Sequence, residues 1–139
     1  MAHWLFKSEP SAWSWDNTVA AGEKGTSWSG VRNHTAKLQM MAMQPGDTGF
    51  FYHSGDGREI VGIVEVCKLF HPDPSDATGK FGMVDIRALR PFKAFVTLAA
   101  VKAEPRLAKM SLVTSFRLSV QPVTAAEWKL VCKMGGVDA

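Results

Sequence analysis

Two short segments carry side chains that could together hold a flat, polar ligand. They are residues 28–33, with the sequence Trp-Ser-Gly-Val-Arg-Asn, and residues 7–10, with the sequence Lys-Ser-Glu-Pro. Trp28 offers a rigid aromatic face, and Gly30 lets another group approach the backbone closely. The arginine and asparagine that follow add a cation and a carboxamide that both donates and accepts hydrogen bonds. These residue types predict a binding site for a flat polar molecule.

A nucleobase is one ligand that fits this chemistry. Recognition of an unstacked base needs an aromatic face, worth about 1 to 3 kcal/mol per base, and polar groups for the base edge. The candidate faces are Trp28, Tyr52 and the other tryptophans, Trp4, Trp13, Trp15 and Trp128. The candidate polar and charged contacts are Ser8, Asn33, Ser54 and Asp85 for the edge, with Lys7, Arg32 and Arg117 for phosphate.

Several of these aromatic and polar residues also have a purely structural interpretation. Trp4 and Trp128 lie on apolar faces and favour the core, whereas Trp13 and Trp15 flank a helix start and favour packing there. Asn33 directly precedes a helical pattern, so it is either a helix cap or a ligand contact. Tyr52 is left open between core and site.

The basic residues are unevenly distributed along the chain. The formal net charge is +3, but residues 87–117 contain seven basic residues and one acidic residue and therefore carry +6. The remainder carries −3. This asymmetry is typical of a surface that contacts phosphate, although a solvated basic face that only maintains solubility would look the same.

Motifs for catalysis or metal binding are weak in this sequence. The four histidines and two cysteines lack zinc-type spacing, and there is no Walker-type loop and no nucleophile elbow. His53 beside Ser54, or Glu9 beside Ser8, could form a base and its partner, which leaves an enzyme as the alternative. Cys67 and Cys132 are predicted to be buried hydrophobes. We expect no cofactor and no metal.

The length and composition fit one globular domain spanning residues 1–139. Hydrophobic residues make up 46% and charged residues 21%, which is ordinary for a folded protein. No apolar run approaches the roughly 20 residues of a membrane helix, and the N-terminus does not resemble a signal peptide. We expect a monomeric, cytoplasmic protein with no membrane partner.

The hydrophobic pattern predicts an α+β fold with a bent mixed sheet or small β-barrel of five to seven strands and flanking short helices. Turn and proline signals separate the elements. The expected strands are 3–7, 48–53, 59–69, 83–89, 91–95 and 117–123, with a loop at 71–79 and a hairpin turn at 54–57. The expected helices are 14–21, 34–43, 97–103 and 124–134. Ser14 and the Thr124–Glu127 capping box are the expected caps of the first and last, Asn33 is left open between a cap and a ligand contact, and Val19, Leu38 and Met41 are expected on buried faces.

Several segments in order resemble the EVE domain, a family of the PUA-like group that is similar in fold to YTH readers of methylated RNA. They are residues 4–11, residues 28–33, Gly46-Asp47 with residues 51–54, and residues 117–124 followed by Glu127-Trp128. The resemblance spans essentially the whole chain. One departure is His34-Thr35, where relatives often carry Tyr-Gln after the Arg-Asn pair.

This resemblance implies non-catalytic binding of a modified nucleobase in DNA or RNA, in a pocket between the end of the first strand and the Trp-containing loop. A protein-interaction module is a further alternative. The residues predicted to bind or to support the ligand are Lys7, Ser8, Glu9, Pro10, Trp28, Gly30, Val31, Arg32, Asn33, Tyr52, His53, Ser54, Asp85, Arg117 and Ser119. We expect the Trp28 indole to lie uncovered at the mouth of the pocket.

Overall fold

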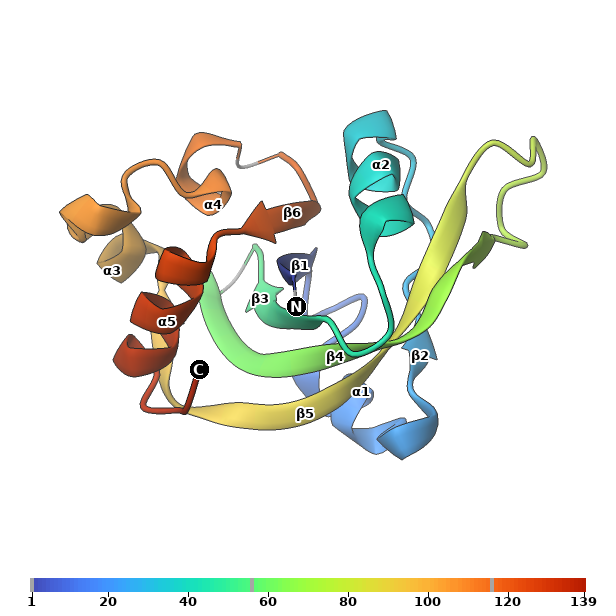
Figure 1. Ribbon diagram of the computed structural model, residues 1–139. Helices are drawn as coiled ribbons and strands as arrows, with labels where there is room; N and C mark the ends of the chain where they lie inside the picture. Colours follow the sequence, from blue (N-terminus) through green and yellow to red (C-terminus); the bar gives the residue numbers. More distant parts are fainter. Residues whose placement is uncertain (1, 56, 116) are drawn as a thin grey trace.

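A bent, open sheet forms the centre of the molecule in the computed structural model, which describes residues 2–55, 57–115 and 117–139 (Figure 1). Within these residues the sheet has six strands in the order β2-β5-β4-β3-β1-β6. The strands are β1 (His3–Ser8), β2 (Thr26–Ser27), β3 (Thr48–His53), β4 (Glu59–Pro72), β5 (Gly82–Thr97) and β6 (Val120–Val123). β1 and β3 are parallel and the other neighbours are antiparallel, so the predicted mixed sheet is confirmed.

The strands β4 and β5 form a long ribbon that curves along the sheet (Figure 1). Their pairing shifts register at several points, including between Ile60 and Gly62. The prediction of separate strands at 83–89 and 91–95 is wrong, because β5 continues through Pro91, which lies opposite Gly62 at that irregularity. A bulge is a position where a strand tolerates a residue without an amide hydrogen. β4 also extends to Pro72, beyond its predicted end.

Short helices flank the sheet, and their N-terminal caps follow the sequence prediction. They are α1 (Trp15–Ala20), η1 (Gly22–Lys24), α2 (His34–Ala42), α3 (Leu98–Ala103), η2 (Pro105–Leu107), α4 (Ser111–Thr114) and α5 (Ala125–Met134). Ser14, Asn33 and Thr124 each accept a hydrogen bond from an amide three residues ahead. The capping box of α5 is present, with Glu127 returning to the Thr124 amide at 2.9 Å. Among the described residues no helix has the length and apolarity needed to span a membrane.

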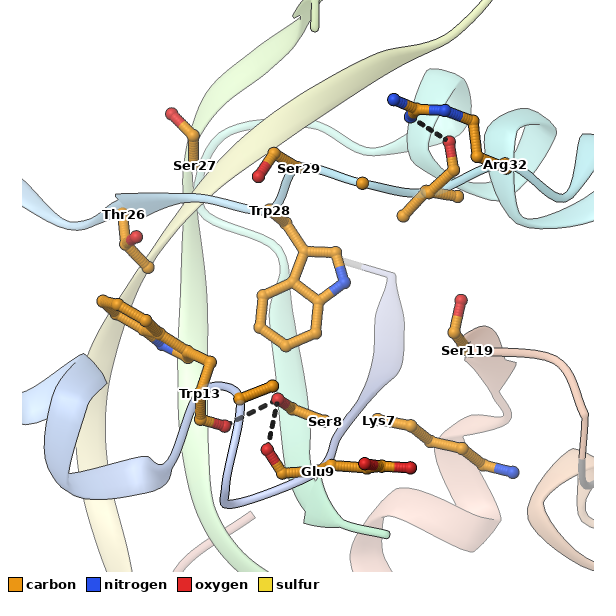
Figure 2. A pocket seen from close by; sticks show the side chains of 13 residues that line it. Lys7, Ser8, Glu9, Trp13, Thr26, Ser27, Trp28, Ser29, Arg32 and Ser119 are labelled. Atoms are coloured by element: carbon orange, nitrogen blue, oxygen red, sulfur yellow. Dashed lines mark hydrogen bonds between the residues drawn. The ribbon is translucent and has the colours of Figure 1, made fainter. Parts of the chain in front are cut away.

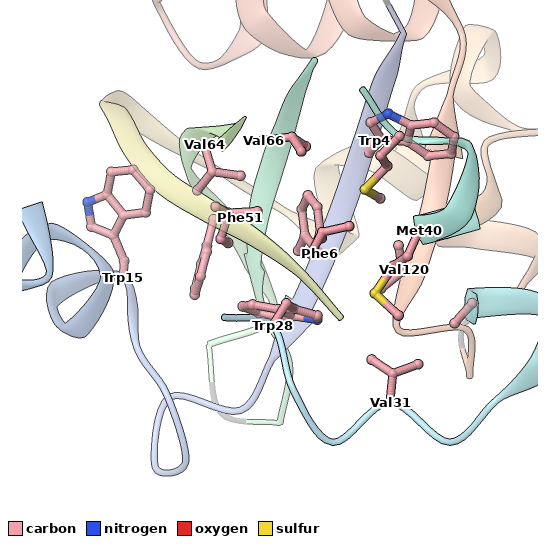
Figure 3. Packing of buried hydrophobic residues seen from close by; sticks show 14 of the residues in the cluster. Trp4, Phe6, Trp15, Trp28, Val31, Met40, Phe51, Val64, Val66 and Val120 are labelled. Atoms are coloured by element: carbon pink, nitrogen blue, oxygen red, sulfur yellow. The ribbon is translucent and has the colours of Figure 1, made fainter. Parts of the chain in front are cut away.

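The two faces of the sheet bury two separate cores. Phe6 and Phe51 belong to one cluster, which α1 and α2 cover with Trp15, Ala36 and Met40 (Figure 3). The neighbouring strand residues Leu5 and Phe50 belong to the other cluster, which is covered by residues of α3, η2, α4 and α5. Side chains of a strand alternate between faces, and the predicted split of β3 into Phe50 with Tyr52 against Phe51 is confirmed.

Two helices turn different faces to the core than the sequence pattern indicates. Leu38 and Met41 of α2 are 64% and 52% exposed, because Ala36 and Met40, one turn apart, make the contact instead. Val19 of α1 is likewise exposed. Apolar residues covered more than one face of these short helices, so the spacing alone selected the wrong one.

Other differences lie in β6 and in the cysteines. The strand predicted for 117–123 begins only at Val120, since the Leu118 amide donates to the Ser115 carbonyl in a turn that the Gln121 side chain also holds. Cys67 is only partly buried, whereas Cys132 is buried as predicted, and burial raises the pKa of its thiol to about 11. Of the hairpin turn predicted at 54–57, position 56 lies outside the described residues.

Candidate functional site

A hollow of about 570 Å³ opens beside the carboxyl end of β1, and we call it the first hollow. It lies between the turn that follows β1 and the loop of residues 26–32, the pocket loop (Figure 2). Both segments named by the sequence analysis therefore meet here. The lining residues are Lys7, Ser8, Glu9, Ala12, Trp13, Thr26, Ser27, Trp28, Ser29, Gly30, Val31, Arg32 and Ser119.

The turn after β1 is closed by its own hydrogen bonds. The amides of Ala12 and Trp13 both donate to the Glu9 carbonyl, at 2.9 and 3.0 Å. The Ser8 hydroxyl donates to the Trp13 carbonyl at 2.6 Å and fastens the two ends of the turn. This local closure, which Pro10 favours by restricting the chain, presents Glu9 and Trp13 to the first hollow.

Trp28 is held in place by backbone and ring contacts. Its amide donates to the Val84 carbonyl of β5 at 2.8 Å. Its indole makes edge-type contacts with Phe6 and Phe51, with centroids 5.3 and 5.8 Å away (Figure 3). Only 9% of the residue is exposed, so the expectation of an uncovered ring is wrong. The indole is part of the core, and it also borders the first hollow (Figure 2).

Trp13 is an aromatic residue of the first hollow, whereas the sequence favoured a packing role for it over a stacking face. Its indole Nε1 donates to the Thr18 hydroxyl at 2.8 Å, which fixes the ring against α1. Trp13 is partly exposed and lines the hollow together with Trp28 (Figure 2). The signal in the sequence was the turn-forming Pro10, since a chain that reverses there returns Trp13 to the end of β1.

The second half of the pocket loop is tied to the connection between β4 and β5. The Gly30 backbone has φ of 83°, a conformation that favours glycine, and its amide donates to Asp73 Oδ2 at 2.8 Å. The Arg32 guanidinium donates to the same carboxylate at 3.4 Å and to the Ser75 hydroxyl at 3.0 Å. Asp73 was not identified from the sequence, because it lies 43 residues from Gly30 in a loop without periodicity.

Seven of the predicted residues do not line the first hollow. Asn33 caps α2 by accepting from the Ala36 amide at 3.0 Å, so its structural alternative is the one observed. Asp85 does not line the hollow; it accepts from the Ser27 hydroxyl at 2.8 Å and contacts His71 at 2.9 Å. Pro10 and Arg117 are outside the lining, as are Tyr52, His53 and Ser54.

The β3 residues among these seven have other surroundings. His53 Nε2 accepts from the Trp15 amide at 3.0 Å at the first turn of α1, and burial lowers the pKa of its imidazole. Tyr52 is 3% exposed and borders, with Ser54, a separate hollow on the opposite side of β1. Whether any of the predicted residues binds a ligand stays a prediction. Among the described residues, no group of three or more His, Cys, Asp or Glu side chains is arranged to hold a metal ion.

Residues 2–134 match the EVE domain family. The chain belongs to this family. The resemblance noted in the sequence is thereby confirmed, and it covers the β1 turn, the pocket loop and α5 together.

Two relatives are similar to this EVE domain over nearly its full length. A Rhodopseudomonas palustris protein solved by NMR is 65% identical with a TM-score of 0.93, over 98% of this chain and 94% of that one. Human thymocyte nuclear protein 1 is 32% identical over 96% of this chain and 73% of that protein. The human protein in complex with DNA containing 5-methylcytosine has a TM-score of 0.90 at 31% identity, over 100% of both chains.

The fold is also similar to that of a YTH domain. The YTH domain of Zygosaccharomyces rouxii MRB1 protein, in complex with N6-methyladenosine RNA, has a TM-score of 0.56 over 99% of this chain and 86% of that one. The identity is 14%, so this likeness concerns the fold alone. The predicted fold class is confirmed by the EVE structures.

Proposed function

We propose that this EVE domain binds a modified base of a nucleic acid in the first hollow and carries out no reaction on it. The observation that supports this most directly is that two indoles, Trp13 and Trp28, line one hollow together with several hydroxyl-bearing residues. The human relative crystallised with DNA containing 5-methylcytosine makes that base the first ligand to test.

The size and lining of the first hollow suit a single base. Its volume of about 570 Å³ falls in the range of small-molecule sites, roughly 300 to 1,000 Å³. The indoles offer apolar surface for stacking and for an added methyl group. Thr26, Ser29 and Glu9 also line the hollow, and their hydroxyl and carboxylate groups can pair with the polar base edge.

Hydrogen bonding at the two candidate pairs, Ser8 with Glu9 and Ser54 with His53, supports binding without catalysis. The Ser8 hydroxyl donates to the backbone carbonyl oxygens of Trp13, at 2.6 Å, and Glu9, at 3.4 Å, which are not bases, and its direction does not favour the Glu9 carboxylate. His53 Nε2 accepts from the Trp15 amide and is therefore already occupied. A general base must reach the proton that it removes, and these contacts direct both candidates elsewhere.

The test is binding of short single-stranded oligonucleotides, with and without one 5-methylcytosine, followed by fluorescence anisotropy. Trp13→Ala should weaken binding of the modified strand by about 1 to 3 kcal/mol, because one stacking surface is lost. Trp28 requires the milder change Trp28→Phe, since removal of a buried indole costs about 3 to 5 kcal/mol of folding stability. Both variants should reduce the preference for the modified base.

Phe95→Ala is the matched control, because Phe95 is an aromatic residue of β5 that is 54% exposed and does not line the first hollow. It should leave the affinity and the preference for the modified base unchanged. If Trp13→Ala and Trp28→Phe bind as well as Phe95→Ala while remaining folded, the first hollow is not the base site.

A further inference from the structure

A second hollow of about 350 Å³ lies on the other side of β1 and gathers positive charge. Its lining includes three cations, Lys7, Arg58 and Lys102, from three separate segments of the chain. Ser54 and Gly55 add a hydroxyl group and a glycine at the end of β3. The described lining residues therefore carry three cations and no carboxylate.

The two hollows lie on either side of the carboxyl end of β1, and Lys7 lies between them. β1 and β3 are parallel, so their carboxyl ends reach the same edge, where Ser8 lies opposite His53. Neighbouring side chains of a strand point to opposite faces, which directs Ser8 and Lys7 to different sides. Lys7 lines both hollows, and its ammonium group points away from the Trp28 ring (Figure 2).

Lys7 is held on the apolar side of the second hollow. Its Nζ lies 5.8 Å from the centre of the Tyr52 ring, and burial lowers the pKa of the ammonium group. Lys7 thus adds a third cation to the positive charge that Arg58 and Lys102 bring to this hollow.

Arg58 enters the second hollow from a strained backbone. Its φ is 45°, and it is the non-glycine residue with positive φ in the described part of the chain. The Leu98 amide fixes this conformation by donating to the Arg58 carbonyl at 2.8 Å. Such strain persists where surrounding structure maintains it, and it is frequent at ligand sites.

Lys102 connects the second hollow to the basic segment of residues 87–117. Within that segment Arg87 bonds to Glu65 and Arg106 bonds to Glu104, so part of the charge excess is neutralised locally. Lys102 projects from α3 and is exposed. It brings charge from this segment to the carboxyl end of β1.

We propose that the second hollow is an anion site that takes a phosphate group, with Lys7, Arg58 and Lys102 as its cations. The group is either a backbone phosphate of a nucleic acid or the phosphate of a free ion or nucleotide. The site does not depend on the base-binding proposal. If both hold, a strand passes over the end of β1, with a base in the first hollow and a phosphate in the second.

Titration with inorganic phosphate, followed by amide chemical shifts in the ¹⁵N-labelled protein, tests the site directly. Saturable shifts are expected at Gly55 and in α3, with affinity reduced about tenfold in Lys102→Gln and in Arg58→Asn. Asparagine adopts positive φ readily, and Lys102 is exposed, so both variants should fold. The control is Lys129→Gln, because Lys129 is an exposed lysine of α5 that does not line the second hollow. This variant should not alter the shifts.

The salt dependence of oligonucleotide binding distinguishes the source of the phosphate. Loss of one contact to a single strand reduces the slope of log K against log salt by about 0.7. Lys102→Gln should show this reduction equally for modified and unmodified strands, whereas Trp13→Ala should leave the slope unchanged and reduce the affinity for the modified strand. A response in the oligonucleotide experiment indicates a backbone phosphate, and a response to inorganic phosphate alone indicates a free one.

The two proposals can fail separately. If Trp13→Ala changes nothing while Lys102→Gln still lowers the salt slope, the base site is wrong and the anion site stands. If Lys102→Gln and Arg58→Asn match Lys129→Gln in both the phosphate titration and the salt slope, the anion site is wrong.

Discussion

The amide nitrogen of Gly30 lies 2.8 Å from Oδ2 of Asp73, which joins the pocket loop to the connection between β4 and β5. Asp73 is only 3% exposed. Burial by itself would raise the pKa of this carboxyl, but hydrogen bonds from Ser75, Gly30 and Arg32 lower it to about 2. The buried Asp73 carboxylate thus holds the pocket loop in place, although Asp73 itself does not line the first hollow.

Asp73→Asn should loosen the pocket loop. An amide has the size of the carboxylate but turns an NH₂ group toward donors, so part of the network is broken, at a cost of about 1 to 3 kcal/mol. Urea unfolding measures the stability, and hydrogen exchange at Gly30 measures the loop. Asp76→Asn is the control, since Asp76 accepts from the Thr78 and Phe81 amides and not from the pocket loop. If the Gly30 amide exchanges its hydrogen at the same rate in both variants, Asp73 does not hold the pocket loop.

The same carboxylate should make stability depend on acid pH. The folded pKa of about 2 lies below the ordinary value of 3.8, so the unfolded chain binds the proton more readily. The contribution of Asp73 is therefore complete above pH 4 and is lost as the pH falls from about 4 through 2. Unfolding free energies measured across this window should fall less steeply in Asp73→Asn than in the natural protein. Parallel curves would show that Asp73 does not carry this dependence.

Contacts within a few residues were accessible from the sequence alone. Asn33 and Thr124 cap their helices through bonds to amides three residues ahead, and residue type with position predicts such bonds. The aromatic and glycine spacing of residues 28–30 likewise predicted a segment that borders a hollow. In each case the physical cause lies within one turn of the chain.

Contacts between distant segments could not be derived in this way. The bond of Gly30 to Asp73 depends on where β4 ends and β5 begins, and the continuation of β5 through Pro91 depends on the bulge opposite Gly62. The burial of Trp28 depends on Phe6 and Phe51 arriving from two other strands. These contacts form only when distant strands assemble into the sheet, so the hydrophobic periodicity of a single segment does not predict them.

Gly62 leaves the space that Trp15 fills. A Cβ added at Gly62 would lie 2.5 Å from the outer ring atoms of Trp15, so Gly62→Ala should destabilise the fold by about 1 to 3 kcal/mol through overpacking. Trp15→Phe removes those ring atoms. In the Trp15→Phe background, Gly62→Ala should therefore reduce the free energy of unfolding much less than it does in the natural protein. Urea unfolding of the two single variants and the double variant should give a coupling energy of at least about 1 kcal/mol. Additive costs would mean that the two residues do not meet as described.

His53 should contribute a separate pH dependence near neutrality. Burial lowers the pKa of its imidazole from 6.5, although Glu59 and Asp16 partly oppose this, and Nε2 must stay unprotonated to accept from the Trp15 amide. Its contribution to stability is therefore complete above pH 6.5 and is lost as the pH falls through the lower folded value. In His53→Gln a side-chain oxygen lies near the Trp15 backbone amide, and this side chain does not titrate. The midpoint temperature of thermal unfolding should therefore fall less between pH 7 and pH 5 than it does in the natural protein. His3 also has a lowered pKa, so some fall in the midpoint should remain in this variant. If the variant and the natural protein show the same dependence of the midpoint on pH, His53 is not the source of that dependence.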